Sequence, residues 1–156
     1  MIRTETEYQE GLRRLKQDRQ ATEEQQAGLV AAGLTPEEVE RGMEPLYAFH
    51  AQLSEDVEWY EHACRGEIPE IHNLEHLGRQ LIALRLARGM SQRELAQRLG
   101  VSEAVVSRDE HNEYHGITTA RAQRVIEALD GSLTARVEEP AGLPARPHRT
   151  LLSSKA

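Results

Sequence analysis

The sequence contains a single cysteine, Cys64, and aromatic residues make up only 4% of its 156 residues. One cysteine cannot form an internal disulfide, which excludes the cross-linked scaffold typical of small secreted proteins. No apolar run approaches the roughly 20 residues that span a bilayer, and residues 1–5 contain no hydrophobic signal core. We therefore expect a cytoplasmic protein with no membrane partner.

Signatures of catalysis are also scarce. The sequence has no P-loop, no dinucleotide fingerprint and no nucleophile elbow. The segment His72–His76 (HNLEH) matches H-x-x-E-H, which on a helix offers two zinc ligands and a general base. Zinc catalysis needs a third ligand as well, and no candidate stands at a motif spacing. We interpret the segment as a solvated helix start, and we predict no enzyme activity, no metal and no cofactor.

Negative charge is concentrated in the N-terminal half. Residues 1–73 carry 7 Lys and Arg against 16 Asp and Glu, a net charge of −9. Residues 74–156 carry 12 against 10, a net charge of +2. The overall charge of −7 therefore hides a mildly basic C-terminal half. Because that positive charge is small, binding to nucleic acid would require a focused basic face and, in practice, a dimer.

The N-terminal half is rich in Glu, Gln, Arg, Leu and Ala, which favour helices. One helix is predicted over about Thr4–Val30. A second helix begins after Thr35, because Thr35 is a good N-cap, Pro36 suits the first helical position, and Glu38 completes a capping box. Pro45 lies inside this second helix and predicts a kink or a break.

An apolar seam runs along the second helix with alternating spacings of four and three residues, as in a heptad repeat. Its members are Val39, Met43, Leu46, His50, Leu53, Val57, Tyr60 and Cys64. The seam can pair with the first helix in a hairpin or with another subunit in a coiled coil. Tyr8, Leu12 and Leu15 form too narrow a stripe to cover all of it. We therefore expect part of the seam to be buried against a second subunit or a partner.

Residues 90–110 (MSQRELAQRLGVSEAVVSRDE) carry the most specific pattern in the chain. Ser91 and Glu94 form a capping-box pair at the start of a helix, Gly100 ends it, and Ser102 caps a second helix. The apolar positions that would pack the two helices together are Leu95, Ala96, Leu99, Val101 and Val106. The remaining face of the second helix consists of Glu103, Ala104, Ser107 and Arg108. Such a small polar surface suits the major groove of DNA, although an ordinary helical hairpin also fits the pattern.

The segment Leu74–Leu133 resembles the helix-turn-helix domain of the Cro/repressor (XRE) class of regulators. The matching residues are Ser91-Gln92, Glu94-Leu95-Ala96, Leu99-Gly100-Val101-Ser102, Val106-Ser107-Arg108 and Glu110. The resemblance implies that the second helix of the pair enters the major groove. It places Glu103, Ala104 and Arg108 at the bases and Gln92 and Ser102 at phosphates. It also implies a structural ion pair between Arg85 and Glu110.

The residues expected to contact DNA are Ser91, Gln92, Arg93, Ser102, Glu103, Ala104, Val105, Ser107, Arg108 and Asn112. Two positions depart from the family pattern. Asp109 stands where an apolar or aromatic residue is usual, so it is either exposed or tied into a local polar cap. The polar segment His111–Gly116 stands where the family has Asn-Gly, and it changes the loop that follows the second helix.

The rest of the C-terminal half completes a five-helix-type domain. One helix is predicted over Leu74–Arg88, and Thr118 or Thr119 caps another. Ser132–Glu138 alternates apolar and polar residues like a strand. A lone strand needs a partner, so we expect it to pair with the same strand of a second subunit. A two-fold dimer of this kind suits a palindromic operator.

We therefore predict an all-α fold with a short terminal strand. Residues 1–66 form a helical extension for dimerisation or partner binding, 67–73 a linker, 74–139 the DNA-binding domain and 140–156 a disordered tail. The predicted function is a homodimeric, sequence-specific transcription regulator, a repressor, that binds double-stranded DNA. The alternative is an antitoxin-like protein of the HigA type, which neutralises a basic toxin through its acidic half and autoregulates its operon. Effector binding by that half ranks last, because its seam shows no polar pocket.

Overall fold

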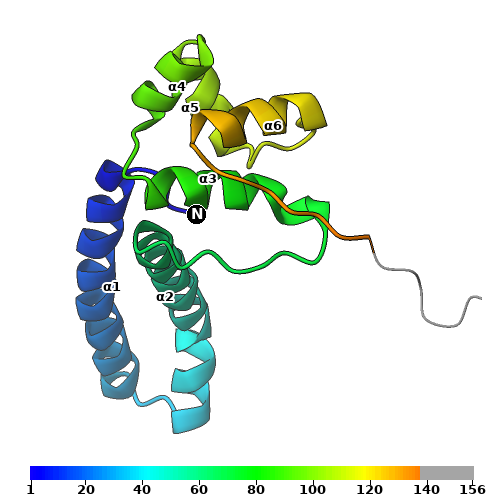
Figure 1. Ribbon diagram of the computed structural model, residues 1–156. Coiled ribbons are helices and arrows are strands. Elements are labelled where there is room, and N and C mark those ends of the chain that lie inside the picture. The colour runs from blue at the N-terminus through cyan, green and yellow to red at the C-terminus, as the bar shows by residue number, and fades with distance from the viewer. Residues whose placement is uncertain (138–156) are drawn as a thin grey trace, which may run out of the picture.

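The computed structural model describes residues 1–137, which form six α-helices and no strand (Figure 1). The helices are α1 (Glu5–Ala31), α2 (Pro36–Cys64), α3 (Leu77–Ala87), α4 (Gln92–Leu99), α5 (Glu103–His111) and α6 (Thr119–Ala128). A single 3-10 turn, Leu74–His76, precedes α3. The all-α prediction is confirmed for this part of the chain. None of these helices is long and apolar enough to cross a membrane.

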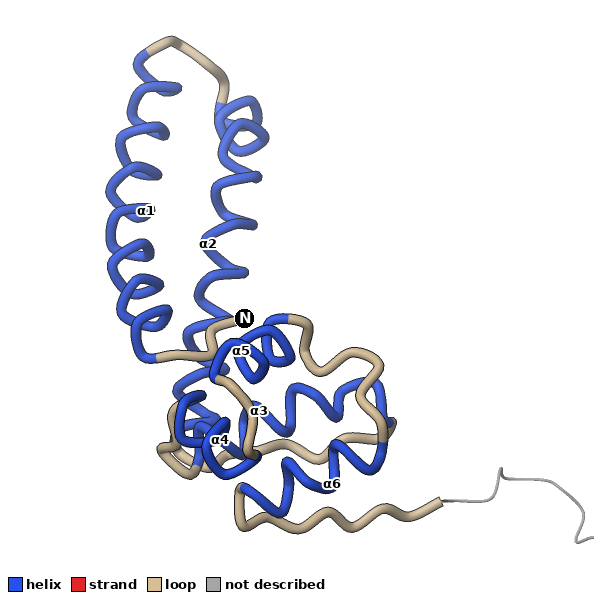
Figure 2. The backbone as a smooth tube through the Cα atoms, turned by 90° about the horizontal axis from the view of Figure 1, so that it is seen from above, coloured by secondary structure: helices blue, strands red, loops and turns tan. Residues whose placement is uncertain are grey.

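Helices α1 and α2 form an antiparallel hairpin that projects from the remaining helices (Figure 2). The hydroxyl of Thr4 accepts a hydrogen bond from the backbone N–H of Glu7 and so caps α1. At the start of α2, Thr35 and Glu38 form both hydrogen bonds of a capping box, with Pro36 in the first helical position, as predicted. The turn between the two helices passes through Gly33, which has a positive φ of 83°.

Helix α2 runs through Pro45 without interruption, so the predicted break is wrong. Proline removes one backbone donor from the helix. The apolar residues Val39 and Met43 before it and Val57 after it are all buried, so packing holds both halves of the helix in place. This burial offsets the lost hydrogen bond, because most helical stability in proteins comes from tertiary contacts.

The hairpin covers much of the predicted seam within one chain. Four seam residues are buried, namely Val39, Met43, Val57 and Tyr60. His50 and Leu53 are half-buried, and Leu46 remains 37% exposed. The ring of Tyr8 stacks on that of Tyr60 with centroids 4.8 Å apart. Gly11 is buried on α1, and a Cβ there would lie 3.0 Å from the side chain of Ile2 and 3.3 Å from that of Val57. Burial of the whole seam between subunits is therefore not needed, and an intermolecular role remains a prediction for its exposed part.

The remaining helices, α3 to α6, form a C-terminal bundle. Leu95 of α4, Val106 of α5 and Val125 of α6 are almost completely buried there together with Ile82 of α3. The first predicted helix of this bundle differs at its start. Asn73 accepts a hydrogen bond from the N–H of Glu75 and begins a 3-10 turn, so the α-helix starts only at Leu77.

The hairpin and the C-terminal bundle share one hydrophobic core. Ile2, Val57, Tyr60 and Ala63 of the N-terminal half belong to the same cluster of buried residues as Leu81 and the rest of the bundle core. The N-terminal amino group pairs with Asp56 at 2.9 Å, and the guanidinium of Arg79 on α3 lies over the ring of Trp59. Residues 67–73, which were predicted to form a linker, are irregular and join two parts that are in contact.

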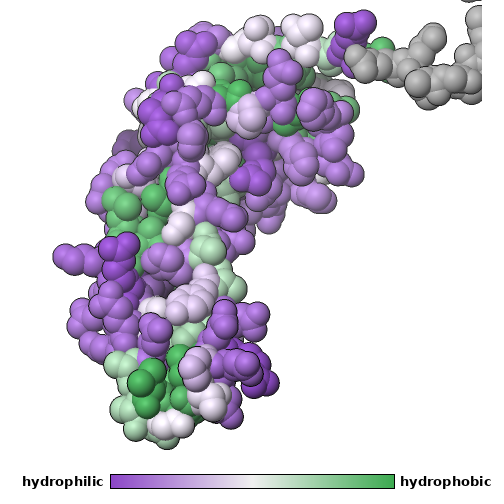
Figure 3. Space-filling view, turned by 90° about the horizontal axis from the view of Figure 1, so that it is seen from below, coloured by the Kyte–Doolittle hydropathy of each residue, from purple (hydrophilic) through white to green (hydrophobic). Residues whose placement is uncertain are grey.

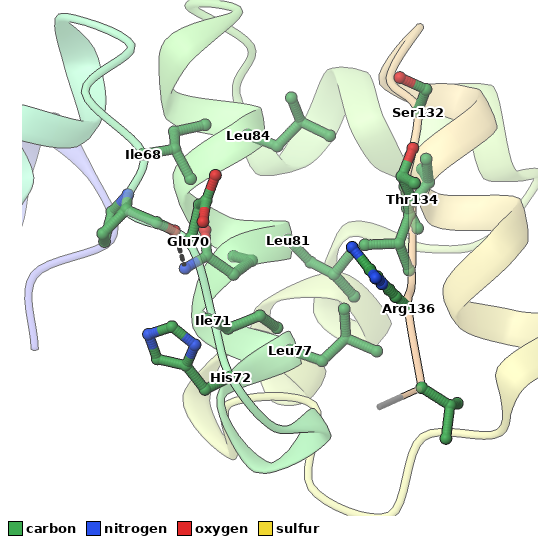
Figure 4. Close-up of a pocket in the computed structure, with 15 residues that line it drawn as sticks. Ile68, Glu70, Ile71, His72, Leu77, Leu81, Leu84, Ser132, Thr134 and Arg136 are labelled. Atoms are coloured by element: carbon green, nitrogen blue, oxygen red, sulfur yellow. Dashed lines mark hydrogen bonds between the residues drawn. The ribbon is translucent and has the colours of Figure 1, made fainter. Parts of the chain in front are cut away.

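Residues 131–137 are extended but belong to no strand. Together with residues 68–72 they flank a groove of about 990 Å³, whose floor includes Leu77, Leu81 and Leu84 of α3 (Figure 4). No backbone group of residues 132–137 hydrogen-bonds to another described residue. The predicted pairing of Ser132–Glu138 with a second subunit thus remains a prediction. Glu138 and the predicted tail, residues 140–156, lie outside the described residues.

Candidate nucleic-acid interface

Helices α4 and α5 meet at a tight turn. Ser91 and Glu94 form both hydrogen bonds of the capping box that starts α4. Gly100 ends the helix with φ 68° and ψ 33°, a left-handed conformation that glycine adopts without a Cβ penalty. Leu95, Ala96 and Val106 are buried between the helices. Ser102 occupies the N-cap position of α5, yet its hydroxyl makes no capping hydrogen bond, contrary to the predicted cap, and the side chain is exposed.

The capping box at the start of α4 shifts the pKa of Glu94. The pKa of Glu94 is lowered because its carboxylate accepts hydrogen bonds from the backbone N–H and then from the hydroxyl of Ser91. A carboxyl group whose pKa is lower in the folded state stabilises the fold at pH values above its unfolded pKa, about 4.3. This contribution is lost as the pH falls through the folded-state pKa.

Replacing Glu94 with glutamine is therefore expected to make the stability of the protein less dependent on pH in the acid range. Thermal unfolding followed by circular dichroism between about pH 6 and pH 2.5 should show a smaller fall in Tm for Glu94→Gln than for the wild type. Glu58→Gln serves as control, because Glu58 is exposed on α2. Parallel curves for Glu94→Gln and the wild type would contradict the role given to this capping box.

One face of α5 is exposed. Glu103, Ala104, Ser107 and Arg108 are exposed, whereas Val106 on the opposite face is buried. Val105 lies at the boundary and is half-buried. The structure therefore places Glu103, Ala104 and Arg108, which were predicted to face bases, on one exposed face of an α-helix, an element that fits a major groove.

The arginines around this face divide into two groups. Arg98 bonds to Asp130 and to the carbonyl of Ala128, and Arg124 bonds to the carbonyl of Leu99, so both brace the bundle. Arg121 of α6 pairs with Asp109, which explains the polar residue where the family has an apolar one. Arg93 and Arg108 are exposed and make no side-chain hydrogen bond or ion pair with any residue in 1–137. They are the two cations of this surface that phosphates or bases can reach without breaking an internal contact.

Arg85 and Glu110 form a buried ion pair behind the exposed face of α5. The Nε of Arg85 donates to Glu110 Oε1 at 2.5 Å and its Nη2 donates to Oε2 at 2.7 Å. The amide of Gln92 donates to the same carboxylate at 2.8 Å, which orients this side chain at the start of α4. The pair therefore links α3, α4 and α5 and fixes the angle between the two helices of the motif.

The loop after α5 is anchored by Tyr114. Its side chain is buried, and burial raises the pKa of its hydroxyl well above the usual range. Asn112, predicted to contact DNA, is exposed at the C-terminal end of α5. The N-terminus also reaches this end, since Arg3 Nη1 lies 3.1 Å from Nδ1 of His111. No sequence pattern predicted this contact, because the two residues are 108 positions apart.

Comparison with known proteins agrees with this geometry. Residues 81–135 match the family model described as helix-turn-helix. This segment is a helix-turn-helix domain of the XRE type. The match confirms the resemblance for this part of the chain, which is about a third of its length. The helix-turn-helix domain is the DNA-binding module of transcription regulators. No curated protein and no solved structure matches the chain.

Proposed function

We propose that the chain is a sequence-specific transcription regulator, a repressor, that reads the major groove with α5. The exposed face of α5, with Arg108 unpaired among the described residues, carries this proposal. Arginine makes paired hydrogen bonds to the N7 and O6 atoms of guanine, and this is the commonest specific contact in the major groove. Arg108 is thus the primary base reader.

The neighbouring residues have supporting roles. Glu103 accepts a hydrogen bond from a cytosine amino group, and Ala104 and Val105 contact a thymine methyl. Ser91, Gln92 and Arg93 at the start of α4, with Ser102, Ser107 and Asn112 around α5, hold the DNA backbone. Contacts of this kind position the protein on the duplex, whereas the base contacts specify the sequence.

Two features of the chain, its few accessible cations and its extended segment 132–137, favour a homodimer on a palindromic operator. Two accessible cations per chain give few phosphate contacts, and affinity depends on their number. The extended segment 132–137 has free backbone groups and exposes Leu133, so it can add to the same segment of a second copy. Pairing about a two-fold axis would present two α5 helices to successive major grooves.

Replacing Arg108 with alanine tests the proposal. The loss of one good base contact is expected to weaken binding by about 1–3 kcal/mol, roughly 5- to 150-fold. Fluorescence anisotropy would compare DNA from upstream of the protein's own gene with scrambled DNA at two salt concentrations. Arg41→Ala is the matched control, because it removes the same charge from an exposed position on α2. Equal and weak binding of the wild type to both DNAs would contradict the proposal.

In the antitoxin-like alternative, the hairpin binds a protein partner. Several large apolar residues of the hairpin stay exposed, among them Val30, Tyr47 and Phe49. Exposed apolar groups that cluster favour a protein partner. In this alternative the helix-turn-helix domain serves autoregulation while the acidic hairpin neutralises a basic toxin. A small basic reading frame beside this gene whose product co-purifies with the chain would favour it.

A further inference from the structure

The free end of the hairpin contains an apolar groove that the DNA-binding function does not use. The groove has a volume of about 430 Å³ and lies where α1 ends and α2 begins. Its apolar wall consists of Val30, Leu34, Pro36, Val39 and Tyr47. Val30 is 60% exposed and Tyr47 is 46% exposed, so both offer surface that a partner could bury. In Figure 3, hydrophobic side chains gather at this end of the molecule.

The end of the hairpin that contains the groove is rich in acidic residues. Residues 20–48 include six glutamates, a single arginine and no lysine, a net charge of −5. Gln26 and Glu40 line the groove itself. The one arginine, Arg41, donates to the carbonyl of Glu37 and does not reach across the groove to neutralise it. An apolar groove at an acidic end of the hairpin defines the chemistry of a matching ligand, which is apolar on one side and positively charged on its flanks.

We propose that this groove docks a basic amphipathic helix of another protein. A groove between two helix ends accepts the apolar face of a third helix, whose residues at positions i, i+3, i+4 and i+7 would fill it. Lysines and arginines on the flanks of that helix are attracted by Glu40 and by the net negative charge of residues 20–48, which favours the encounter and the correct partner. Tyr47 is the main anchor, because it lines the groove and tyrosine is enriched among the few residues that supply most of the binding energy of an interface.

Self-association through this groove is disfavoured by the same charges. A second copy would bring two ends of net charge −5 together, and like charges that face each other oppose binding. The free end of the hairpin also lies far from α4 and α5 in both backbone views (Figures 1 and 2). A partner can therefore occupy the groove without blocking the exposed face of α5. If no partner binds there, the proposed DNA binding is unaffected.

The test uses the full chain and a defined probe. The probe is an amphipathic peptide of about 18 residues, five helical turns, with leucines on one face and lysines on the other. A counterpart with glutamates in place of the lysines controls for charge. Amide chemical shifts of the isotopically labelled protein should change around Val30, Leu34 and Tyr47 with the basic peptide only.

Variants then separate the groove from general electrostatic attraction. The double variant Val30→Ser/Tyr47→Ser should bind the basic peptide roughly tenfold more weakly or worse, with an unchanged Tm and unchanged DNA affinity. Leu74→Ser is the control, because Leu74 is exposed outside the hairpin. Shift changes spread over all acidic residues, or equal binding of the double variant, would overturn the proposal. Dimers that dissociate when Tyr47 is replaced would also overturn it, in favour of a second copy as the occupant.

Discussion

Replacing Glu110 with alanine is expected to lower the free energy of unfolding by about 3–5 kcal/mol. The side chain of Glu110 is completely buried and accepts hydrogen bonds from Arg85 and from Gln92. Its removal would leave the guanidinium of Arg85 buried without a counter-charge, although Arg85 would still donate to the carbonyls of Met90 and Arg3. An unpaired buried charge costs far more than an intact pair contributes.

Urea denaturation of matched variants distinguishes this cause from a simple loss of packing. The double variant Arg85→Met/Glu110→Leu removes both charges and should recover most of the lost stability, because apolar residues of similar size replace buried pairs well. Glu58→Ala, an exposed change on α2, should stay within about 0.5 kcal/mol of the wild type. If Glu110→Ala is as stable as Glu58→Ala, the structural role of the pair is wrong.

The second large effect is expected at Gly78, in the first turn of α3. A Cβ at this position would lie 1.7 Å from the carbonyl oxygen of Glu113 and 2.6 Å from its carbonyl carbon. Glu113 and Tyr114 both have positive φ values, so the loop already adopts an unusual conformation where it meets α3. Because the obstacle is backbone, Gly78→Ala should cost about 3 kcal/mol or more, at the upper end for overpacked cores.

Gly28 provides the matched control. It lies in α1, and a Cβ there would meet nothing within 4 Å. Since alanine is the better helix former, Gly28→Ala should stabilise the protein by about 0.5–1 kcal/mol. Chemical denaturation of both variants checks the pair of expectations. A Gly78→Ala protein with the wild-type unfolding midpoint would contradict the close approach between α3 and the loop after α5.

Local signals in the sequence predicted several of the helix boundaries. Thr35 with Glu38, Ser91 with Glu94, and Gly100 after Leu99 each act within a few residues, so the sequence alone contains the whole interaction. The same holds for the pattern that placed α4 and α5, since the spacing of apolar residues determines which face is buried. The family match to residues 81–135 supports this part of the sequence interpretation.

Long-range contacts could not be predicted in this way. Arg98, Arg121 and Arg124 are as basic in the sequence as Arg108, but only the fold shows that they bond to Asp130, Asp109 and the carbonyl of Leu99. Nothing in the sequence indicated that the backbone of Glu113 lies close to Gly78. The prediction of a break at Pro45 was wrong for a similar reason. The packing of α2 on both sides of the proline outweighs the tendency of proline to interrupt a helix.

Selection of binding sites from random double-stranded DNA would show whether α5 reads a base sequence. We expect the full chain to enrich a recurrent motif with two inverted half-sites about 10 base pairs apart, centre to centre. The Arg108→Ala variant should lose the preference at one base pair of each half-site while it still binds DNA in a salt-dependent way. A wild-type protein that enriches no motif, or a variant that selects the same motif with the same preference, would contradict DNA reading by α5.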